Sequence, residues 1–177
     1  HNNERRYHNF SKMQQKISDV EIDNNIDWKR IHWRALEFNY GKAPYFDEYK
    51  QFFQEVYEKK WTKLVDINRA IIKFLVGELK IDREIVLSSD LGLKEKGTDL
   101  LIEMCKKLNA NTYLSGQAAK SYLELEKFKE NKLNHGFINF QYPTYLQQFS
   151  PFIPNLSVID ALFNCGKKET RRLIEGN

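Results

Sequence analysis

The sequence predicts an α/β fold: a helical first half, followed by a β-α-β-α-β order that forms a mostly parallel, Rossmann-like three-layer sheet. Two observations predict this class. Over residues 27–80, apolar side chains recur at helical spacing in three successive segments. Over residues 84–177, short apolar runs alternate with helical patterns, and strands separated by helices pair in parallel with right-handed crossovers. We expect a single domain over residues 1–177.

The composition is that of a folded protein with a core. The chain has 177 residues, within the roughly 100–200 residues of one domain. Its hydrophobic fraction of 41% is ordinary for a globular protein. Aromatic residues make up 14% and are spread along the chain, which argues against disorder because disordered chains lack the side chains that bury surface.

The net charge of +4 does not by itself point to nucleic acid. Lysine and arginine alternate with acidic residues, and the densest basic runs are short. Such runs form solvated helix faces or attract an anionic partner such as a phosphate group. The sequence contains no RNP-like pattern or zinc finger, so we expect no nucleic-acid partner.

The cysteines, histidines and apolar runs indicate the compartment and the absence of a metal. Cys105 and Cys165 lie within apolar helical patterns, so we expect free buried thiols in a reducing, cytoplasmic environment. No apolar run approaches the roughly 18 residues of a membrane span, so we expect no membrane-spanning segment. The four histidines show no metal-ligand spacing, so we expect no metal. The sequence does not indicate which cofactor, if any, the protein uses.

The pattern of the first half predicts a polar segment followed by three helices. Residues 1–26 form a polar arm or an edge strand, and 27–80 form the helical part. Asp27 is a good N-cap for the first helix, Gly41 ends that helix, and Pro44 suits the first turn of the second. The third helix runs from residue 64 to about 79. The second helix carries an aromatic stripe that indicates core or a helix-packing interface: Tyr45, Tyr49, Phe52 and Phe53.

The α/β part, 84–177, contains three short apolar runs and three helical patterns. The runs predict strands at 84–87, 111–114 and 135–140, and helices are predicted over 100–108 and 118–130. A proline-punctuated loop and a helix that opens near Ser157 follow.

Polar residues at the predicted strand ends are the first candidates for a site. Ser88 and Ser89 follow the first strand, and Ser115 and Gly116 follow the second. Ligands of open parallel sheets bind outside the carboxyl ends of the strands, and glycine allows the backbone to approach a ligand closely. The alternative is that serine and glycine only turn each strand into the next helix. None of these serines has a histidine base nearby in the sequence, and Ser115 is not followed by the residues of a nucleophile elbow.

A second group of candidates lies in the last third of the chain. Tyr145 and Gln147 stand in an aromatic loop, where such residues either seal the core or stack on and hydrogen-bond a ligand. Asn164 follows on the last helix. Asp160 comes three residues after Ser157, a spacing that favours a helix-capping role over catalysis.

A set of segments in this chain resembles the WbqC-like family, which is found among bacterial surface-polysaccharide and O-antigen gene sets. The segments follow the family's order over about residues 16–166, and they are specific as a set. They are 27–29 (Asp-Trp-Lys), 39–46 (Asn-Tyr-Gly-Lys-Ala-Pro-Tyr-Phe), 64–68 (Leu-Val-Asp-Ile-Asn), 88–89 (Ser-Ser), 113–116 (Tyr-Leu-Ser-Gly) with Ala119 and Tyr122, 145–147 (Tyr-Leu-Gln) and 154–166 (Pro-Asn-Leu-Ser-Val-Ile-Asp-Ala-Leu-Phe-Asn-Cys-Gly).

The chain departs from the family at its beginning. Family members resemble each other in an N-terminal segment with a His-Gln-Pro strand end, an aromatic-Pro-Trp-Leu-Gly turn and an Asp-x-Val-Gln strand. This sequence contains none of these motifs. We therefore expect the chain to begin after that segment, as a shortened or divergent member, without any catalytic residue that the segment carries.

The resemblance implies a role in making or modifying surface glycans, with transfer of an amino-acyl or acyl group suggested by gene context. We expect a group-transfer enzyme that uses a small activated, phosphate-bearing donor; its catalytic residues and any homo-oligomeric state stay open. The alternative is a non-catalytic nucleotide-sugar-binding or scaffold protein of the same pathway, whose aromatic first-half helices form a partner surface. In the enzyme hypothesis, Ser88, Ser89, Ser115 and Gly116 line the donor pocket, and Tyr145, Gln147 and Asn164 orient the acceptor.

Overall fold

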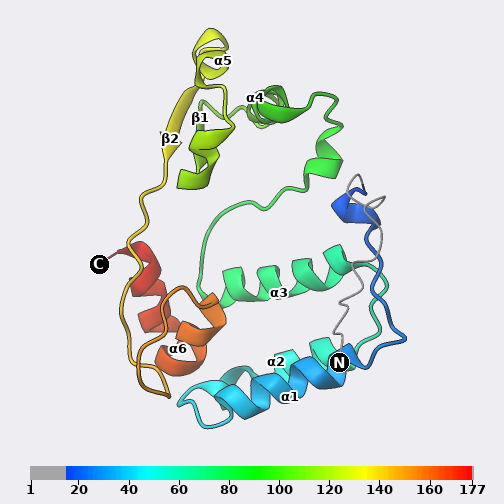
Figure 1. Ribbon diagram of the computed structural model, residues 1–177, viewed down its shortest axis with the longest axis vertical. Helices are drawn as coiled ribbons and strands as arrows, with labels where there is room; N and C mark the ends of the chain where they lie inside the picture. The colour runs from blue at the N-terminus through cyan, green and yellow to red at the C-terminus, as the bar shows by residue number, and fades with distance from the viewer. Residues whose placement is uncertain (1–14, 177) are drawn as a thin grey trace, which may run out of the picture. The chain divides into compact units, whose positions relative to one another are not determined.

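In the computed structural model, residues 15–176 are described, and they divide into two compact units (Figure 1). Unit 1 contains the described residues up to Asp82 and from Pro143 onward, and unit 2 contains Arg83–Tyr142. Unit 1 is built of helices, and unit 2 holds a two-stranded parallel sheet with short helices. The single domain over residues 1–177 stays a prediction.

Unit 1 confirms the three helices predicted in the first half of the chain. Helix α2 is the central one, because it packs against α1, α3 and α6. Asp27 occupies the N-cap position of α1, yet its carboxylate makes no capping hydrogen bond and pairs with Arg30 instead. The four helices are α1 (Trp28–Tyr40), α2 (Phe46–Glu58), α3 (Leu64–Glu78) and α6 (Val158–Glu175).

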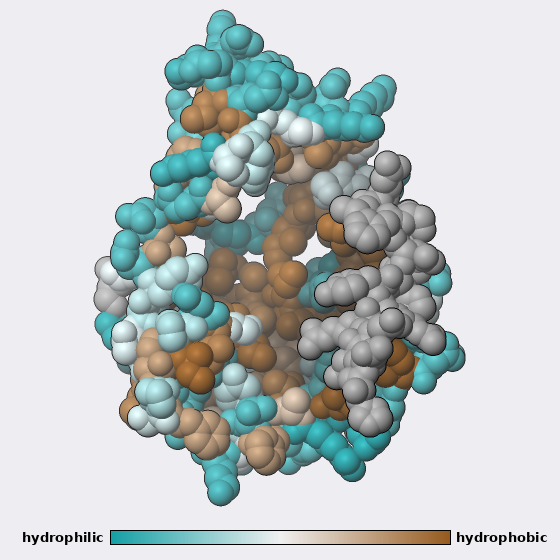
Figure 2. Space-filling view, in the orientation of Figure 1, coloured by the Kyte–Doolittle hydropathy of each residue, from teal (hydrophilic) through white to brown (hydrophobic). Residues whose placement is uncertain are grey.

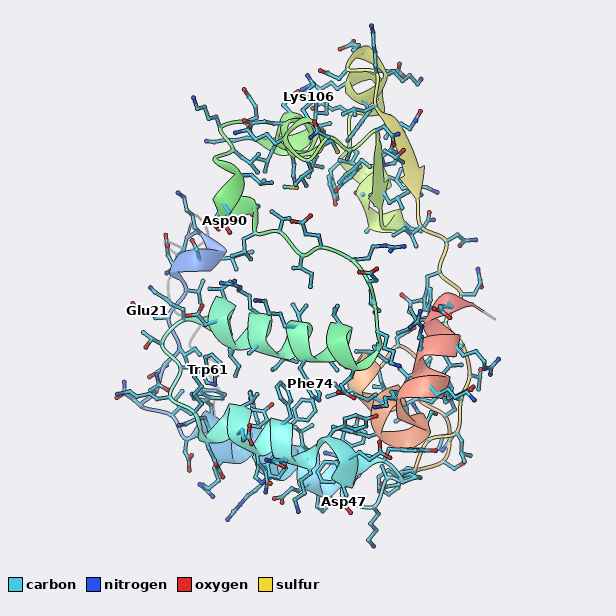
Figure 3. All side chains as sticks on the ribbon, turned by 180° about the vertical axis from the view of Figure 1, so that it is seen from behind. Glu21, Asp47, Trp61, Phe74, Asp90 and Lys106 are labelled. Atoms are coloured by element: carbon cyan, nitrogen blue, oxygen red, sulfur yellow. The ribbon has the colours of Figure 1, made fainter. Side chains whose placement is uncertain are left out.

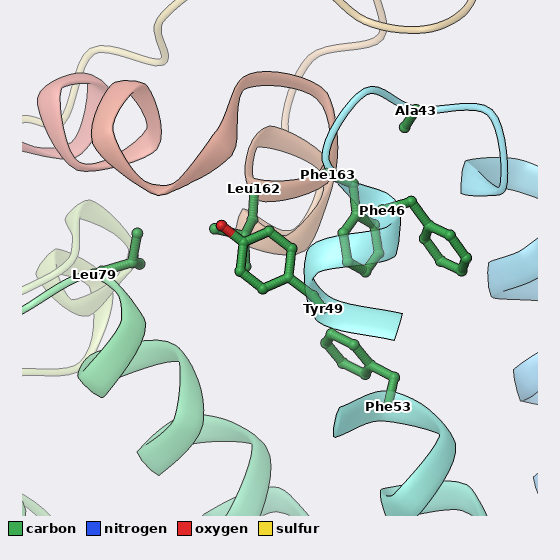
Figure 4. Close-up of a cluster of buried hydrophobic side chains, with 7 residues drawn as sticks. All are labelled: Ala43, Phe46, Tyr49, Phe53, Leu79, Leu162 and Phe163. Atoms are coloured by element: carbon green, nitrogen blue, oxygen red, sulfur yellow. The ribbon is translucent and has the colours of Figure 1, made fainter. Parts of the chain in front are cut away.

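The core of unit 1 forms around Phe163 of α6, which is fully buried (Figure 4). Its ring centroid lies 5.1 Å from that of Tyr40 on α1 and 5.2 and 5.5 Å from those of Phe46 and Phe53 on α2. Edge-to-face contacts at these distances add to the stabilisation from buried area. A single side chain of α6 thus packs against both α1 and α2.

The aromatic stripe of α2 is used in this core. Tyr49 and Phe53 are each 2% exposed, and Phe52 stacks on Phe74 of α3 with ring centroids 3.6 Å apart and planes 7° apart. Figure 3 shows Phe74 on the side of α3 that faces α2. The stripe therefore joins α2 to α3 and α6, as the sequence predicts for a core or packing face.

The segment before α1 pairs with the loop between α2 and α3. A 3₁₀ turn, η2 (Ile17–Asp19), is followed by an isolated antiparallel bridge between Glu21 and Lys63. The backbone N–H of Ile22 donates to the carbonyl of Thr62 at 2.9 Å. Within the described residues, the polar arm thus makes a single bridge, and the part of the arm at 1–14 lies outside them.

Unit 2 contains the parallel pair that the sequence predicts. Strand β1 (Thr112–Ser115) pairs with β2 (Asn134–Phe137), with Ser115 opposite Phe137. Figure 2 shows hydrophilic residues over the end of unit 2 that carries α5, in keeping with the lysines and glutamates of that short helix. Around the pair lie η3 (Ser88–Leu91), α4 (Gly97–Lys107), η4 (Gln117–Ser121) and α5 (Leu125–Glu130).

The Rossmann-like three-layer sheet is not found among the described residues, where the sheet has two strands. The strand predicted at 84–87 was wrong: this run carries no regular structure, and Ile85 and Val86 are 48% and 37% exposed. Three apolar residues in a row favour a strand only where a neighbouring strand pairs with them, and no described strand pairs with this run. The third predicted strand, 135–140, ends at Phe137 as β2.

The helix predicted over 118–130 is divided into η4 and α5. The chain leaves helical geometry at Glu124, where φ is −89° and ψ is 86°. Ala119 and Phe128 are both buried, but a continuous helix with about 100° per residue would place them on opposite faces. The break lets both side chains face the interior, and the ring of Phe128 stacks on Tyr113 of β1 at 5.5 Å.

None of the described helices is both long enough and apolar enough to cross a membrane.

A sharp bend at Gly166 shapes α6. Its backbone has φ of 72° and ψ of 168°, a region that is essentially restricted to glycine. A Cβ atom at this position would lie 2.7 Å from the ring of Tyr45. The bend therefore requires glycine both for its dihedral angles and for the space that the Tyr45 ring occupies.

We expect Gly166→Ala to lower the free energy of unfolding by at least about 1–3 kcal/mol, because the variant takes on backbone strain and a clash. Urea denaturation followed by circular dichroism measures the change. Gly77→Ala is the matched control: it lies in α3 with no atom within 4 Å of an added Cβ, so we expect about 0.4–1 kcal/mol of stabilisation. Equal effects of the two variants would contradict the argument.

Candidate functional site

Three of the predicted site residues meet around a carboxylate in unit 1. Tyr145 donates a 2.8 Å hydrogen bond from its hydroxyl to Oδ1 of Asp160, and Gln147 donates from Nε2 to the same oxygen at 3.0 Å. Asn164 donates from Nδ2 to the backbone carbonyl of Asp160 at 2.8 Å. Asp160 is only 4% exposed. The structure thus centres the group on a buried carboxylate for which the sequence predicted a capping role.

The capping role of Asp160 was wrong. Ser157 occupies the N-cap position of α6, but no side-chain capping hydrogen bond forms there. Asp160 lies one turn into the helix and directs its carboxylate to the loop that carries Tyr145 and Gln147. The spacing Ser-x-x-Asp is compatible both with a helix cap and with a carboxylate that binds a neighbouring loop. Only the position of that loop in the folded protein distinguishes the two.

The side-chain amide of Gln147 also links two positions of its own loop by hydrogen bonds. Its Oε1 accepts from the backbone N–H of Ile153 at 2.8 Å, and its Nε2 donates to the Ile153 carbonyl at 2.9 Å. Asn164 adds a second anchor, since its Oδ1 accepts from the backbone N–H of Gln148 at 2.8 Å. These bonds fix the loop over the first two turns of α6.

A pocket of about 270 Å³ opens beside Asp160 within unit 1. This is slightly below the roughly 300–1,000 Å³ of pockets for drug-sized ligands, which suits a smaller molecule. Its rim is apolar and exposed: Phe149, Ile153 and Leu156 are 61%, 55% and 42% exposed. Asn39, Tyr40, Gln147, Gln148, Asp160 and Asn164 supply the polar lining.

Of the described residues that line the pocket, Asp160 is the one charged group, and it lacks a partner of opposite charge. No lysine, arginine or histidine among the described residues forms an ion pair with Asp160. The buried Oε1 atom of Gln148 has no hydrogen-bond partner within the same part of the chain. A buried amide oxygen without a partner is costly, and so is a buried charge without a charge of opposite sign, so these two groups favour a ligand that donates hydrogen bonds.

The tyrosines around Asp160 are held in their neutral form. Burial raises the pKa of Tyr145 to about 12, and its hydrogen bond to Asp160 adds to the shift. Burial followed by the charge of Asp160 also raises the pKa of Tyr40. The two phenols therefore act near neutral pH as hydrogen-bonding groups beside the carboxylate.

The remaining predicted site residues lie in unit 2. Ser88 and Ser89 are exposed in η3, where the hydroxyl of Ser89 donates to Oδ1 of Asp90 at 3.2 Å. Because no strand precedes them, they do not stand at a sheet edge with Ser115 and Gly116. Ser115 ends β1 and is buried, and Gly116 is exposed before η4.

Ser115 has a histidine partner that the sequence did not suggest. Its Oγ lies 2.9 Å from Nε2 of His135 on the neighbouring strand β2. The two residues are 20 positions apart, and only the register of the parallel pair brings them together. No spacing motif connects them, although Ser115 at a predicted strand end and His135 in the next strand are compatible with such a contact.

Two larger hollows in unit 1 are different in character. One, of about 480 Å³, is lined by exposed basic side chains such as Lys59, Lys60 and Lys73. The other, of about 450 Å³, is mostly apolar and includes Trp28 and Tyr57. Neither contains a buried charged group, whereas the pocket beside Asp160 does.

No cluster of three or more histidine, cysteine or acidic side chains suited to a metal ion occurs within residues 15–176. Cys105 is buried and Cys165 half-buried, and both are free thiols.

The comparison with known proteins identifies the family. The WbqC-like protein family matches residues 9–172, and the chain belongs to this family. It is 34% identical over 154 residues to the uncharacterized protein Rv1507c of Mycobacterium tuberculosis, a match that covers 86% of this chain and 66% of that protein. The chain thus spans just under two thirds of its relative's length. No solved structure gives a significant match.

The pKa of Tyr145 gives a testable pH dependence. Its pKa is about 12 in the folded protein and near the usual 10.0 in the unfolded chain. The unfolded state therefore loses this proton first as the pH rises. The resulting stabilisation is complete below pH 10 and is lost as the pH rises towards 12.

Tyr145→Phe is accordingly expected to lower the free energy of unfolding by about 1.5–3 kcal/mol at neutral pH, the worth of one hydrogen bond to a charged group. Its free energy of unfolding should then decline less steeply than that of the wild type between pH 10 and 12. Urea denaturation at a series of pH values measures both effects, with Tyr142→Phe, at a side chain that is 68% exposed, as control. Parallel pH profiles of the wild type and Tyr145→Phe would refute the assignment.

Proposed function

We propose that this protein is a group-transfer enzyme of bacterial surface-glycan biosynthesis, of the O-antigen type, and that the pocket beside Asp160 holds the acceptor. Membership of the WbqC-like family supports the pathway. The pocket supports the binding of a small molecule. The acceptor is a sugar whose amino or hydroxyl group receives an amino-acyl or other acyl group from an activated donor.

The buried Asp160 carboxylate carries this proposal. It accepts hydrogen bonds from Tyr145 and Gln147 through one oxygen, Oδ1. Both donors are neutral, so the negative charge is hydrogen-bonded but not neutralised. Removing such a charge from water costs several kcal/mol unless a partner compensates. Tyr40, the third phenol or amide beside the carboxylate, is neutral as well. A ligand ammonium group beside Asp160 would supply that compensation.

The charges of the lining select the chemical class of the occupant. The lining residues include one carboxylate and no lysine or arginine, so a phosphate placed against Asp160 would be repelled. An amine would bind favourably, because a hydrogen bond with a charged partner is worth about 1.5–3 kcal/mol against about 0.5–1.5 kcal/mol for a neutral one. The apolar rim suits the less polar face of a sugar ring.

The same charge argument assigns the donor and the acceptor to different residues. A phosphate-bearing donor would fit the residues of unit 2 better, where the ammonium of Lys120 lies 5.0 Å from the ring centroid of Phe137, the residue opposite Ser115. In this proposal Ser115 and Gly116 remain the donor residues, and Tyr145, Gln147 and Asn164 remain the acceptor residues.

A scaffold role finds less support. That alternative relies on the aromatic residues of the first helices as a partner surface. Tyr49 and Phe53 are buried in the core, and Phe52 is stacked on Phe74. These residues of the α2 stripe are therefore occupied by intramolecular contacts, whereas Phe38 of α1 is 86% exposed.

Binding of glucosamine and N-acetylglucosamine tests the acceptor pocket. We expect glucosamine to bind more tightly, because only its ammonium group carries a positive charge for Asp160. Asp160→Asn should weaken glucosamine binding about 10-fold, the difference between a charged and a neutral hydrogen bond. Isothermal titration calorimetry measures both affinities, and circular dichroism confirms that the variant is folded.

Glu175→Gln is the matched control, since this acid lies on the same helix but pairs with Arg171 outside the pocket. It should bind glucosamine as the wild type does. Equal affinity for the two sugars, or no binding of either, would overturn the proposed acceptor pocket, as would unchanged binding by Asp160→Asn. Tighter binding of a nucleotide-sugar to a site that requires Asp160 would favour the non-catalytic alternative.

A further inference from the structure

A serine and a histidine are paired on one face of the sheet in unit 2. Tyr113 and Ser115 share a face of β1, because successive strand residues alternate. His135 and Phe137 likewise share a face of β2, and Tyr113 is opposite His135 in the register. The 2.9 Å contact between Ser115 Oγ and His135 Nε2 thus runs diagonally between the strands. With its proton on Nδ1, His135 accepts the serine's hydrogen bond at Nε2.

From this geometry we propose that Ser115 is a nucleophile and His135 its base, so that Ser115 accepts an acyl group from an activated acyl donor before the group passes to an acceptor. A serine hydroxyl is a weak nucleophile until an adjacent base takes its proton, and a hydrogen bond of about 2.6–3.2 Å between the two is the structural signature of such a pair. This site goes beyond the acceptor pocket and rests on a separate set of residues.

Aromatic rings fix the orientation of the His135 imidazole. The ring of Phe137 meets it edge-to-face with centroids 4.4 Å apart, and the Phe128 and Tyr113 rings lie at 5.3 and 6.0 Å. In many nucleophile–base pairs a third polar group orients the base. Here no described residue makes a hydrogen bond to Nδ1, and packing holds the ring in place.

The backbone beside Ser115 offers hydrogen-bond donors for a reacting carbonyl. The N–H groups of Gly116 and Gln117 have no acceptor among the described residues. Backbone N–H groups that follow a nucleophile can stabilise the oxyanion that forms on its attack. Gly116 has φ of −70° and ψ of 162°, and an added Cβ would meet nothing within 4 Å. The space beside the Gly116 backbone is therefore open, and an acyl donor would reach the buried Ser115 hydroxyl from this side.

The reaction conserves atoms and protons. Ser115 Oγ bonds to the donor's carbonyl carbon while its proton moves to His135 Nε2. The tetrahedral adduct then collapses, the bond from carbon to the leaving group breaks, and the leaving group takes that proton. The acyl group remains on Ser115 as an ester. An amine or hydroxyl acceptor, or water, next attacks the ester as its proton moves to Nε2, and Ser115 Oγ leaves with that proton.

The surroundings favour an anionic leaving group. The Lys120 ammonium lies over Phe137, which is opposite Ser115 in the register. No ion pair occupies Lys120 among the described residues. Its charge would stabilise a departing phosphate. The donor class is therefore an acyl phosphate or a related acyl ester of a phosphate.

Acetylation of the 177-residue chain by p-nitrophenyl acetate and by acetyl phosphate tests this inference. We expect the wild type to acquire one acetyl group, and peptide mass spectrometry to locate it on Ser115. Ser115→Ala should abolish this labelling. His135→Gln should slow acetylation roughly 100-fold or more, the usual contribution of a general base. Lys120→Gln should slow the reaction with acetyl phosphate about 10-fold and leave p-nitrophenyl acetate unaffected, because only the former leaving group is a phosphate.

Ser121→Ala is the matched control, since Ser121 is an exposed serine of the same unit whose hydroxyl donates to the backbone carbonyl of Ala118 at 3.0 Å instead of to a histidine; its labelling should equal that of the wild type. Mapping the label in the wild type requires no variant, so the test holds even if Ser115→Ala fails to fold. An unlabelled Ser115 in the wild type, or labelling at the same rate in His135→Gln, would overturn the inference. Neither result depends on glucosamine binding, so failure here is distinct from failure of the acceptor pocket.

Discussion

The burial of Phe163 is the constraint on which unit 1 depends. This side chain of α6 is fully buried and contacts rings of α1 and α2. Asp160 lies three residues before it and Asn164 one residue after it, so fixing Phe163 fixes both polar side chains. Residues i and i+4 of a helix share a face, and Asp160 and Asn164 point together to the loop they anchor. An aromatic core contact thereby positions a carboxylate.

Two further contacts hold α6 in that position. The backbone N–H of Tyr45 donates to the carbonyl of Phe163 at 3.0 Å, and the Tyr45 ring occupies the space that the missing Cβ of Gly166 leaves. Tyr40 both packs against Phe163 and lines the pocket beside Asp160. The pocket lining and the core of unit 1 therefore share the side chain of Tyr40.

Sequence periodicity predicted what depends on local pattern. The three helices of the first half and the parallel pairing of β1 with β2 follow from apolar spacing and chain order. The run at 84–87 has the same apolar character as a strand but finds no partner, and the helix expected over 118–130 breaks because Ala119 and Phe128 both require burial. Strand pairing and burial depend on residues that are distant in the chain. A local sequence pattern does not show which distant residues will pair with a segment or cover it.

The candidate sites also combine features that the sequence predicts with features that only the folded structure shows. From the sequence we could predict the family, the three helices of the first half, and residues from which a site could be built, including Ser115, Tyr145, Gln147 and Asn164. The folded structure was needed to show that Asp160 is a buried carboxylate rather than a helix cap, and that His135 lies beside Ser115. The physical reason is that a carboxylate's or hydroxyl's chemistry depends on its hydrogen-bond partners and burial, and these come from segments that only folding brings together.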